Sequence, residues 1–106
     1  MDMAKMMRQA KEMQDRMTQM QADLEHVEVI GQSGGGMVKA TMTCKKTLRA
    51  LEIAPEVITP EDPEMLADLI VAAVNDAGLK ADTKTAEETK IMMGGMGLPD
   101  DIKLPF

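Results

Sequence analysis

Residues 3–27, MAKMMRQAKEMQDRMTQMQADLEHV, contain a heptad pattern of apolar residues. The spacing alternates between three and four residues, which is typical of an amphipathic helix with one apolar side. The apolar positions are Met3, Met6, Ala10, Met13, Met17, Met20, Leu24 and Val27. The run has no Pro or Gly and is rich in good helix formers. We therefore predict that the first segment, residues 1–25, is one long helix that begins at residue 2.

This helix would be long for the size of the chain. At 1.5 Å per residue it would measure roughly 36 Å, while a compact domain of this length is only about 35 Å across. The helix must therefore span the molecule or protrude from it. A protruding helix with an apolar side needs a surface to lie against.

The composition indicates one small domain, residues 1–106, with a soft core. Thirteen of the 106 residues are Met and only one is aromatic, Phe106. Flexible Met side chains specify a core weakly, so we expect an oligomer to complete the fold. The single cysteine, Cys44, excludes an intramolecular disulfide and suits a reducing compartment. No secretory pattern or apolar run of about 20 residues is present, so we expect a soluble cytoplasmic protein.

The net charge of −6 argues against a general nucleic-acid binder, but the charge is uneven. Residues 1–22 carry four cations and three anions, and residues 37–54 carry four cations and one anion. Residues 55–75 carry five anions and no cation. Local fields, not the net figure, govern contact with a polyanion.

Residues 26–54 predict three short strands in an antiparallel meander, because the apolar period changes from 3.5 to 2. Residues 31–36, GQSGGG, could suggest a phosphate-binding loop, but such a loop leads from a strand into a helix. Here the glycines precede another strand, so we predict a hairpin loop. A second turn is expected near residues 43–46. One face of the middle strand would carry Val38, Ala40, Met42 and Cys44, and the other Met37, Lys39, Thr41, Thr43 and Lys45.

Residues 60–93 predict the second helix. Either Thr59 or Asp62 can cap its start, since Pro follows each and acids fill the first turn. Its apolar face carries Leu66, Leu69, Ile70, Ala73, Val74 and Ala77, and the pairs Asp76–Lys80 and Lys84–Glu88 support its continuation. Glycines near residue 94 should end it and leave residues 94–106 as a mobile tail. The two helices together could cover one face of the sheet.

No residue pattern indicates catalysis, a cofactor or a metal site. The Met pairs have helical spacing but no His or Cys among them, so packing explains them better than copper binding. His26 fits a surface position and Cys44 a small core position, and neither has a partner visible in the sequence for nucleophilic chemistry. We predict that the protein is not an enzyme and has no small-molecule substrate.

Four cations on the first helix, outside its apolar heptad positions, are candidates for phosphate contacts. They are Lys5, Arg8, Lys11 and Arg16. The helix N-terminus adds free N–H groups and a positive dipole end. A solvated polar face explains the same residues, because Asp2, Glu12 and Asp15 lie on this helix too. Both interpretations remain open on residue chemistry alone.

Several segments in this order resemble the YbaB/EbfC family of bacterial nucleoid-associated DNA-binding proteins. They are MRQA (7–10) with MQ (13–14), GQSGGGMVK (31–39), RALEI (49–53), EMLADLI (64–70), NDA (75–77), GLP (97–99) and KLPF (103–106). The family pattern often has a second cation after Arg49, an Asp at position 54, Asn-Gly at the second turn and more Arg after residue 77. This chain has Ala50, Ala54, Thr43-Cys44 and Gly78-Leu79-Lys80 there.

The resemblance implies an α+β protomer of order α-β-β-β-α, with a three-stranded antiparallel sheet and long projecting N- and C-terminal helices. It implies a homodimer with tweezer-like arms that binds double-stranded DNA in the nucleoid, with limited sequence preference, in nucleoid organisation or gene regulation. The DNA contacts would come from Lys5, Arg8, Lys11 and Arg16, with Lys80, Lys84 and Lys90. The dimer interface would include Val38, Ala40, Met42, Leu51, Ile53, Leu66, Leu69, Ile70, Ala73 and Val74. The alternative is a protein-interaction or chaperone-like module that uses the Met-rich side of the first helix.

Overall fold

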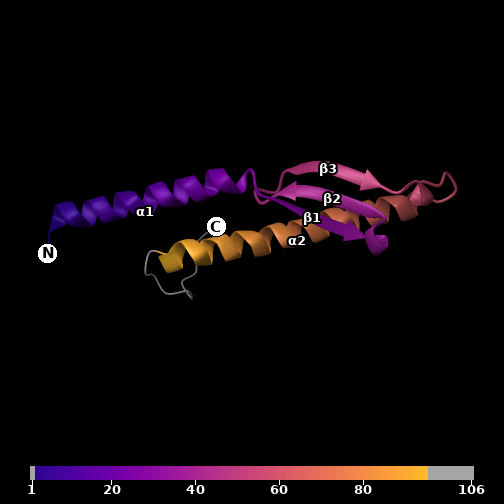
Figure 1. The fold of residues 1–106 in the computed structure, drawn as a ribbon. Helices are drawn as coiled ribbons and strands as arrows, with labels where there is room; N and C mark the ends of the chain where they lie inside the picture. The colour runs from indigo at the N-terminus through magenta and orange to yellow at the C-terminus, as the bar shows by residue number, and fades with distance from the viewer. Residues whose placement is uncertain (1, 96–106) are drawn as a thin grey trace.

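The computed structural model describes residues 2–95, which form a helix, a three-stranded sheet and a second helix (Figure 1). The elements are α1 (Met3–Leu24), β1 (Glu28–Ser33), β2 (Val38–Thr43), β3 (Leu48–Ile53) and α2 (Pro63–Gly95). Short 3₁₀ turns occupy Gly34–Gly36 and Pro55–Val57. The α-β-β-β-α order expected from the sequence is confirmed.

The molecule is elongated, because α1 points away from the sheet (Figure 1). The principal extents are 72 × 22 × 17 Å and the radius of gyration is 19.3 Å, against about 13 Å for a compact chain of 100 residues. This confirms that the first helix protrudes. The expectation that both helices cover the sheet is wrong: α2 packs on β1 and β2, while α1 leaves the sheet end as an arm.

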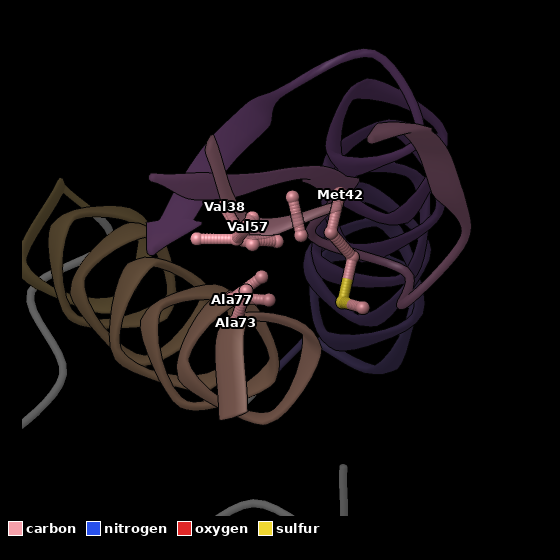
Figure 2. Packing of buried hydrophobic residues seen from close by; sticks show 7 residues of the cluster. Val38, Met42, Val57, Ala73 and Ala77 are labelled. Carbon is pink, nitrogen blue, oxygen red and sulfur yellow. The ribbon is translucent and has the colours of Figure 1, made fainter. Parts of the chain in front are cut away.

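The sheet has the order β1-β2-β3 and is antiparallel throughout. Its core lies between β2 and α2, where alternate residues of the strand face the helix (Figure 2). The members are Val38, Ala40, Met42, Val57, Ala73, Ala77 and Ala81, each at most 6% exposed. The predicted inward face of β2 is therefore confirmed. Small Ala side chains let α2 lie close to the strands.

Gly31 of β1 lies directly against the backbone of α2. An added Cβ there would lie 2.2 Å from the Ala77 nitrogen and 2.4 Å from the Ala73 oxygen. Both atoms belong to the helix backbone, which cannot rotate away as a side chain can. Gly31 was expected in the glycine loop, and its role in packing could not be predicted because its contact partners lie more than 40 residues away in the chain.

Both turns of the meander use positive φ angles. In the β1–β2 loop Gly34 and Gly36 have φ angles of 59° and 93°, which confirms the predicted hairpin. At the β2–β3 turn the Thr43 oxygen accepts a hydrogen bond from the Lys46 N–H at 2.9 Å, and Lys46 has a φ of 71°. Positive φ therefore falls on Lys46, not on the Thr43-Cys44 pair.

Thr43 departs from the predicted alternation, because it is buried at 1% exposure although we expected it on the outer face of β2. Two features explain this. The register with β3 shifts between Thr41 and Met42, which interrupts the regular period of two. The Thr43 hydroxyl also accepts a hydrogen bond from the Thr47 N–H at 3.2 Å, which holds it inside the turn.

Helix α2 begins at Pro63, three residues later than predicted, because Asp62 is the cap. The Asp62 carboxylate accepts a hydrogen bond from the Met65 N–H at 3.1 Å. The helix continues through Gly94 and Gly95, so the expected stop at residue 94 is wrong by two residues. The rest of the predicted mobile tail, residues 96–106, lies outside the described residues.

Candidate nucleic-acid interface

Lys5, Arg8, Lys11 and Arg16 are all exposed on α1. Helical spacing places all four outside the methionine seam, defined here as Met3, Met6, Ala10, Met13, Met17 and Met20, with Arg8 opposite it and Arg16 beside it. Within residues 2–95, Lys5, Arg8 and Arg16 have no carboxylate within 4.0 Å. Lys11 lies 3.6 Å from Asp15, but both side chains are at least two-thirds exposed, so water screens the pair. The four cations are available to an incoming polyanion.

The N-terminus of α1 is already capped by an anion. The Asp2 carboxylate accepts a hydrogen bond from the Ala4 N–H at 3.0 Å, and the Asp2 carbonyl accepts one from the Met6 N–H. A carboxylate at this position also offsets the positive end of the helix dipole. A phosphate at the α1 terminus would therefore have to compete with Asp2, which weakens that part of the sequence interpretation.

Two of the three candidate cations on α2 are held by acids of the same helix. Lys80 lies 3.1 Å from Asp76 and also donates a hydrogen bond to the Ile30 carbonyl at 3.1 Å. Lys84 lies 3.3 Å from Glu88. Lys90 is exposed near the far end of the helix. Neutralised cations release fewer counterions from DNA, so α1 is the stronger candidate surface.

The sequence interpretation left out four cations that the structure places on the sheet or at its turn. Lys39 and Arg49 are exposed on β2 and β3, and the register sets Lys39 opposite Glu52. At the β2–β3 turn, Lys45 donates to the Gln21 side chain of α1, and Lys46 pairs with Asp82 of α2 at 2.9 Å. The +3 balance of residues 37–54 was the available signal, and it gave no indication of these pairings.

The methionine seam is most open at the tip of α1. Met3 and Met6 are 75% and 49% exposed, and with Met7 and Ala10 they line a shallow apolar pocket of about 230 Å³. Toward the sheet the seam becomes half-buried, and the Thr89 hydroxyl of α2 lies 3.9 Å from the Met20 sulfur. The outer half of the seam is therefore an uncovered apolar surface beside the cations.

The two residues considered for nucleophilic chemistry occupy ordinary structural positions. Cys44 is buried, as predicted, and burial raises the pKa of its thiol, which keeps it protonated near neutral pH. His26 is exposed after the end of α1. Within residues 2–95 no cluster of three or more His, Cys, Asp or Glu side chains could hold a metal ion, and neither α1 nor α2 is long and apolar enough to cross a membrane.

The residues proposed for a dimer interface fall into two groups. Val38, Ala40, Met42 and Ala73 are buried within the protomer, so they offer a second copy almost no surface. The others keep exposed area along β3 and α2: Leu51, Ile53, Leu66, Leu69, Ile70 and Val74. Of the residues predicted for the interface, only this second group has surface to offer a second copy, and the interface itself stays a prediction.

Comparisons with known proteins agree with this fold. A profile of the YbaB/EbfC DNA-binding family matches residues 1–96. A nucleoid-associated protein of Granulibacter bethesdensis is 50% identical over 105 residues, and one of Bartonella tribocorum is 42% identical over 105 residues. Each alignment covers 99% of this chain and 98% of the relative. The crystal structure of an uncharacterized protein from Helicobacter pylori is similar, with a TM-score of 0.65 at 23% identity over 91% of this chain and 97% of that one. As the sequence resemblance predicted, this chain belongs to the YbaB/EbfC DNA-binding family.

Proposed function

We propose that this protein binds double-stranded DNA as a homodimer, mainly through phosphate contacts and with limited sequence preference. It would act in nucleoid organisation or gene regulation, in the bacterial cytoplasm. Two observations support the proposal together. The family is a DNA-binding one, with relatives named nucleoid-associated proteins, and this chain presents Lys5, Arg8, Lys11 and Arg16 on a projecting arm.

The exposed cations on α1 are the observation that carries the proposal. Phosphate contacts dominate the affinity of proteins for DNA, and each contact releases counterions. Helix α1 stands clear of the sheet (Figure 1), so its exposed cations can approach a duplex without the sheet in between. In a dimer two such arms would double the number of contacts.

The side chains on the arm favour backbone contact over base recognition. Direct readout of bases relies on Arg, Asn or Gln placed to bond base edges in the major groove. Helix α1 has Arg and Gln side chains but no Asn, and Glu12 and Asp15 lie among its cations, where their negative charge opposes close approach to the base edges. Within residues 2–95 there is no Phe, Tyr or Trp side chain on which an unpaired base could stack. Binding should therefore depend strongly on salt and weakly on sequence.

The test is fluorescence anisotropy of a labelled mixed-sequence duplex, titrated with protein at several salt concentrations. Lys5→Glu with Arg8→Glu changes the arm, and Lys39→Glu with Arg49→Glu is the control with the same change in net charge. If each arm cation contacts one phosphate in a dimer, the arm variant should flatten the slope of log K against log salt by about 3.6, from a loss of four contacts at roughly 0.9 each. The control should change the slope far less.

The same experiment can contradict the proposal. Equal effects of the two variants would show that only net charge matters and that the arm is not the site. Unchanged affinity in the arm variant would remove these residues from the interface. Sedimentation equilibrium of the wild-type protein tests the dimer separately, because a monomer at the concentrations used for binding would contradict that part alone.

The second candidate function is a protein-interaction module, favoured by the uncovered apolar pocket at the tip of α1. Met3, Met6, Met7 and Ala10 line this pocket, and Met-rich surfaces adapt to different partners. A partner held there by apolar contact should remain bound as salt rises, whereas a duplex held by phosphate contacts should dissociate. The salt series therefore separates the two functions.

A further inference from the structure

The edge of the sheet formed by β1 has an unusual covering. A strand at a sheet edge presents unpaired N–H and C=O groups, which can accept another strand. Here α2 runs along β1 (Figure 1), and two of its charged side chains make hydrogen bonds at that edge. The Gln32 N–H donates to the Asp76 carboxylate at 2.9 Å, and the Lys80 ammonium donates to the Ile30 carbonyl at 3.1 Å. We call this pair of side chains the clasp.

The clasp occupies two of the backbone groups that a new strand would need. Ile30 and Gln32 are two residues apart, so their backbone groups point to the same side of β1, away from β2. A strand added antiparallel at this edge would bond both the N–H and the C=O of each residue, and the clasp takes the Ile30 C=O and the Gln32 N–H. Asp76 and Lys80 lie 3.1 Å apart, so they also neutralise each other.

The packing of α2 makes the clasp possible. Asp has a short side chain, so it reaches the β1 backbone only if the helix lies close to the strand. Gly31, between the two clasped residues, gives that proximity, because its missing Cβ leaves room for the backbone at Ala73 and Ala77. The spacing of four residues places Asp76 and Lys80 on the same side of the helix, one turn apart.

The other edge of the sheet lacks such a covering. Within residues 2–95 no side chain makes a hydrogen bond to the backbone of β3. The clasp is therefore specific to β1, next to the exposed Ile30 side chain, which is 56% exposed. An apolar side chain beside free backbone groups is the combination that favours pairing between strands of different molecules.

We propose that the Asp76–Lys80 clasp blocks strand addition at the β1 edge by a second copy of this chain, and so limits the assembly of the protein. Every copy carries the same edge, and two such edges can pair antiparallel about a twofold axis. This inference does not depend on DNA binding. It assigns Lys80 to the sheet edge and removes it from the candidate phosphate contacts.

The test compares two double variants by sedimentation velocity over a range of protein concentrations. Asp76→Ala with Lys80→Ala removes the clasp. Lys84→Ala with Glu88→Ala is the matched control, because this pair has the same spacing on the same helix and its ion pair does not involve the β1 backbone. We expect the clasp variant to form species larger than those of the wild type, increasing with concentration, while the control sediments like the wild type. Circular dichroism checks that both variants fold.

Hydrogen exchange at the Gln32 amide provides the second measurement. Losing one hydrogen bond of ordinary strength should speed exchange by roughly tenfold in Asp76→Ala. Unchanged exchange would show that the clasp does not hold this amide. Faster exchange with an unchanged sedimentation profile would show that an open β1 edge recruits no second copy. Larger species in both double variants would make the effect unspecific, and each of these three results overturns the proposal.

If the double clasp variant does not fold, Lys80→Met replaces it. This substitution retains Asp76 and its bond to Gln32, keeps an apolar stem of similar length, and frees only the Ile30 carbonyl. We expect a smaller shift toward larger species. A sedimentation profile equal to that of the wild type would contradict the proposal in this variant as well.

Discussion

Replacing Gly31 with Ala should strongly destabilise the protein, although it adds only one methyl group. The new Cβ would lie 2.2 Å from the Ala77 nitrogen, 2.4 Å from the Ala73 oxygen and 2.6 Å from the Ala77 Cα. Favourable contacts between such atoms begin near about 3.5 Å, so α2 would have to move away from β1 by roughly 1 Å. All three atoms belong to the helix backbone, so no side-chain rotation can relieve the overlap.

The expected loss is about 3 kcal/mol, at the upper end of the range for overpacked cores. Moving α2 away from the sheet would weaken the packing of Val38 and Ala40, which are fully buried. It would also lengthen the hydrogen bond between Gln32 and Asp76. This loss is a large part of the total stability of such a domain, about 5–15 kcal/mol. Each 1 kcal/mol lowers the melting temperature by about 4 °C at this chain length, so the expected decrease is roughly 12 °C.

Urea unfolding followed by far-ultraviolet circular dichroism measures this loss, at one fixed protein concentration because association would change the apparent stability. Gly78→Ala is the matched control. Its added Cβ would meet only the Lys46 ammonium at 3.8 Å, and Ala is a better helix former than Gly by up to about 1 kcal/mol. The first variant should lose stability and the second should gain it. A loss below about 1 kcal/mol for Gly31→Ala would refute the close contact between β1 and α2.

Two further predictions concern α2. Asp62→Ala removes the helix cap at Met65 and should cost about 1 kcal/mol in the same urea assay, whereas Thr59→Ala should cost much less. The bond from the Gln32 N–H and the Lys80 ammonium hold the pKa of Asp76 below its ordinary value. The folded state therefore favours the ionised form, so this stabilisation is present above the ordinary Asp pKa near about 3.9 and is lost as pH falls through the lowered value. Unfolding curves between pH 6 and pH 3 should show a smaller acid loss in Asp76→Ala than in the wild type, and equal losses would contradict the role given to Asp76.

The features that the sequence predicted correctly are those that depend on neighbouring residues. The period of α1, the alternation along β2 and the presence of a capped helix start within residues 59–63 all arise within a few residues of the chain, although the sequence left Thr59 and Asp62 as alternative caps. The length of α1 left two options, spanning the molecule or protruding from it, and the structure has the second. The end of α2 was missed because two Gly residues cost only about 2 kcal/mol in a helix of 33 residues, which is too little to stop it.

The features that the sequence did not predict depend on contacts between distant segments. Nothing near Gly31 indicates that α2 lies against it, so the residue was assigned to the following loop. Lys80 was counted as a DNA contact because a lysine on a helix usually faces solvent, while its carbonyl partner at Ile30 is 50 residues away. The same limit applies to the predicted dimer residues, of which Val38 and Ala40 turned out to be enclosed by their own α2.

Ion pairs within the fold determine which cations of the chain are available to DNA. The net charge is −6, yet several of the acids serve to hold cations in place. Asp76, Glu88 and Asp82 each pair with a lysine, so three of the seven cations on the sheet, its turn and α2 are held by acids. The cations of α1 are mostly unpaired and stand apart from the acidic start of α2. If DNA binds, the number of phosphates measured from the salt slope should therefore follow the cations on α1 and not the total of twelve in the chain.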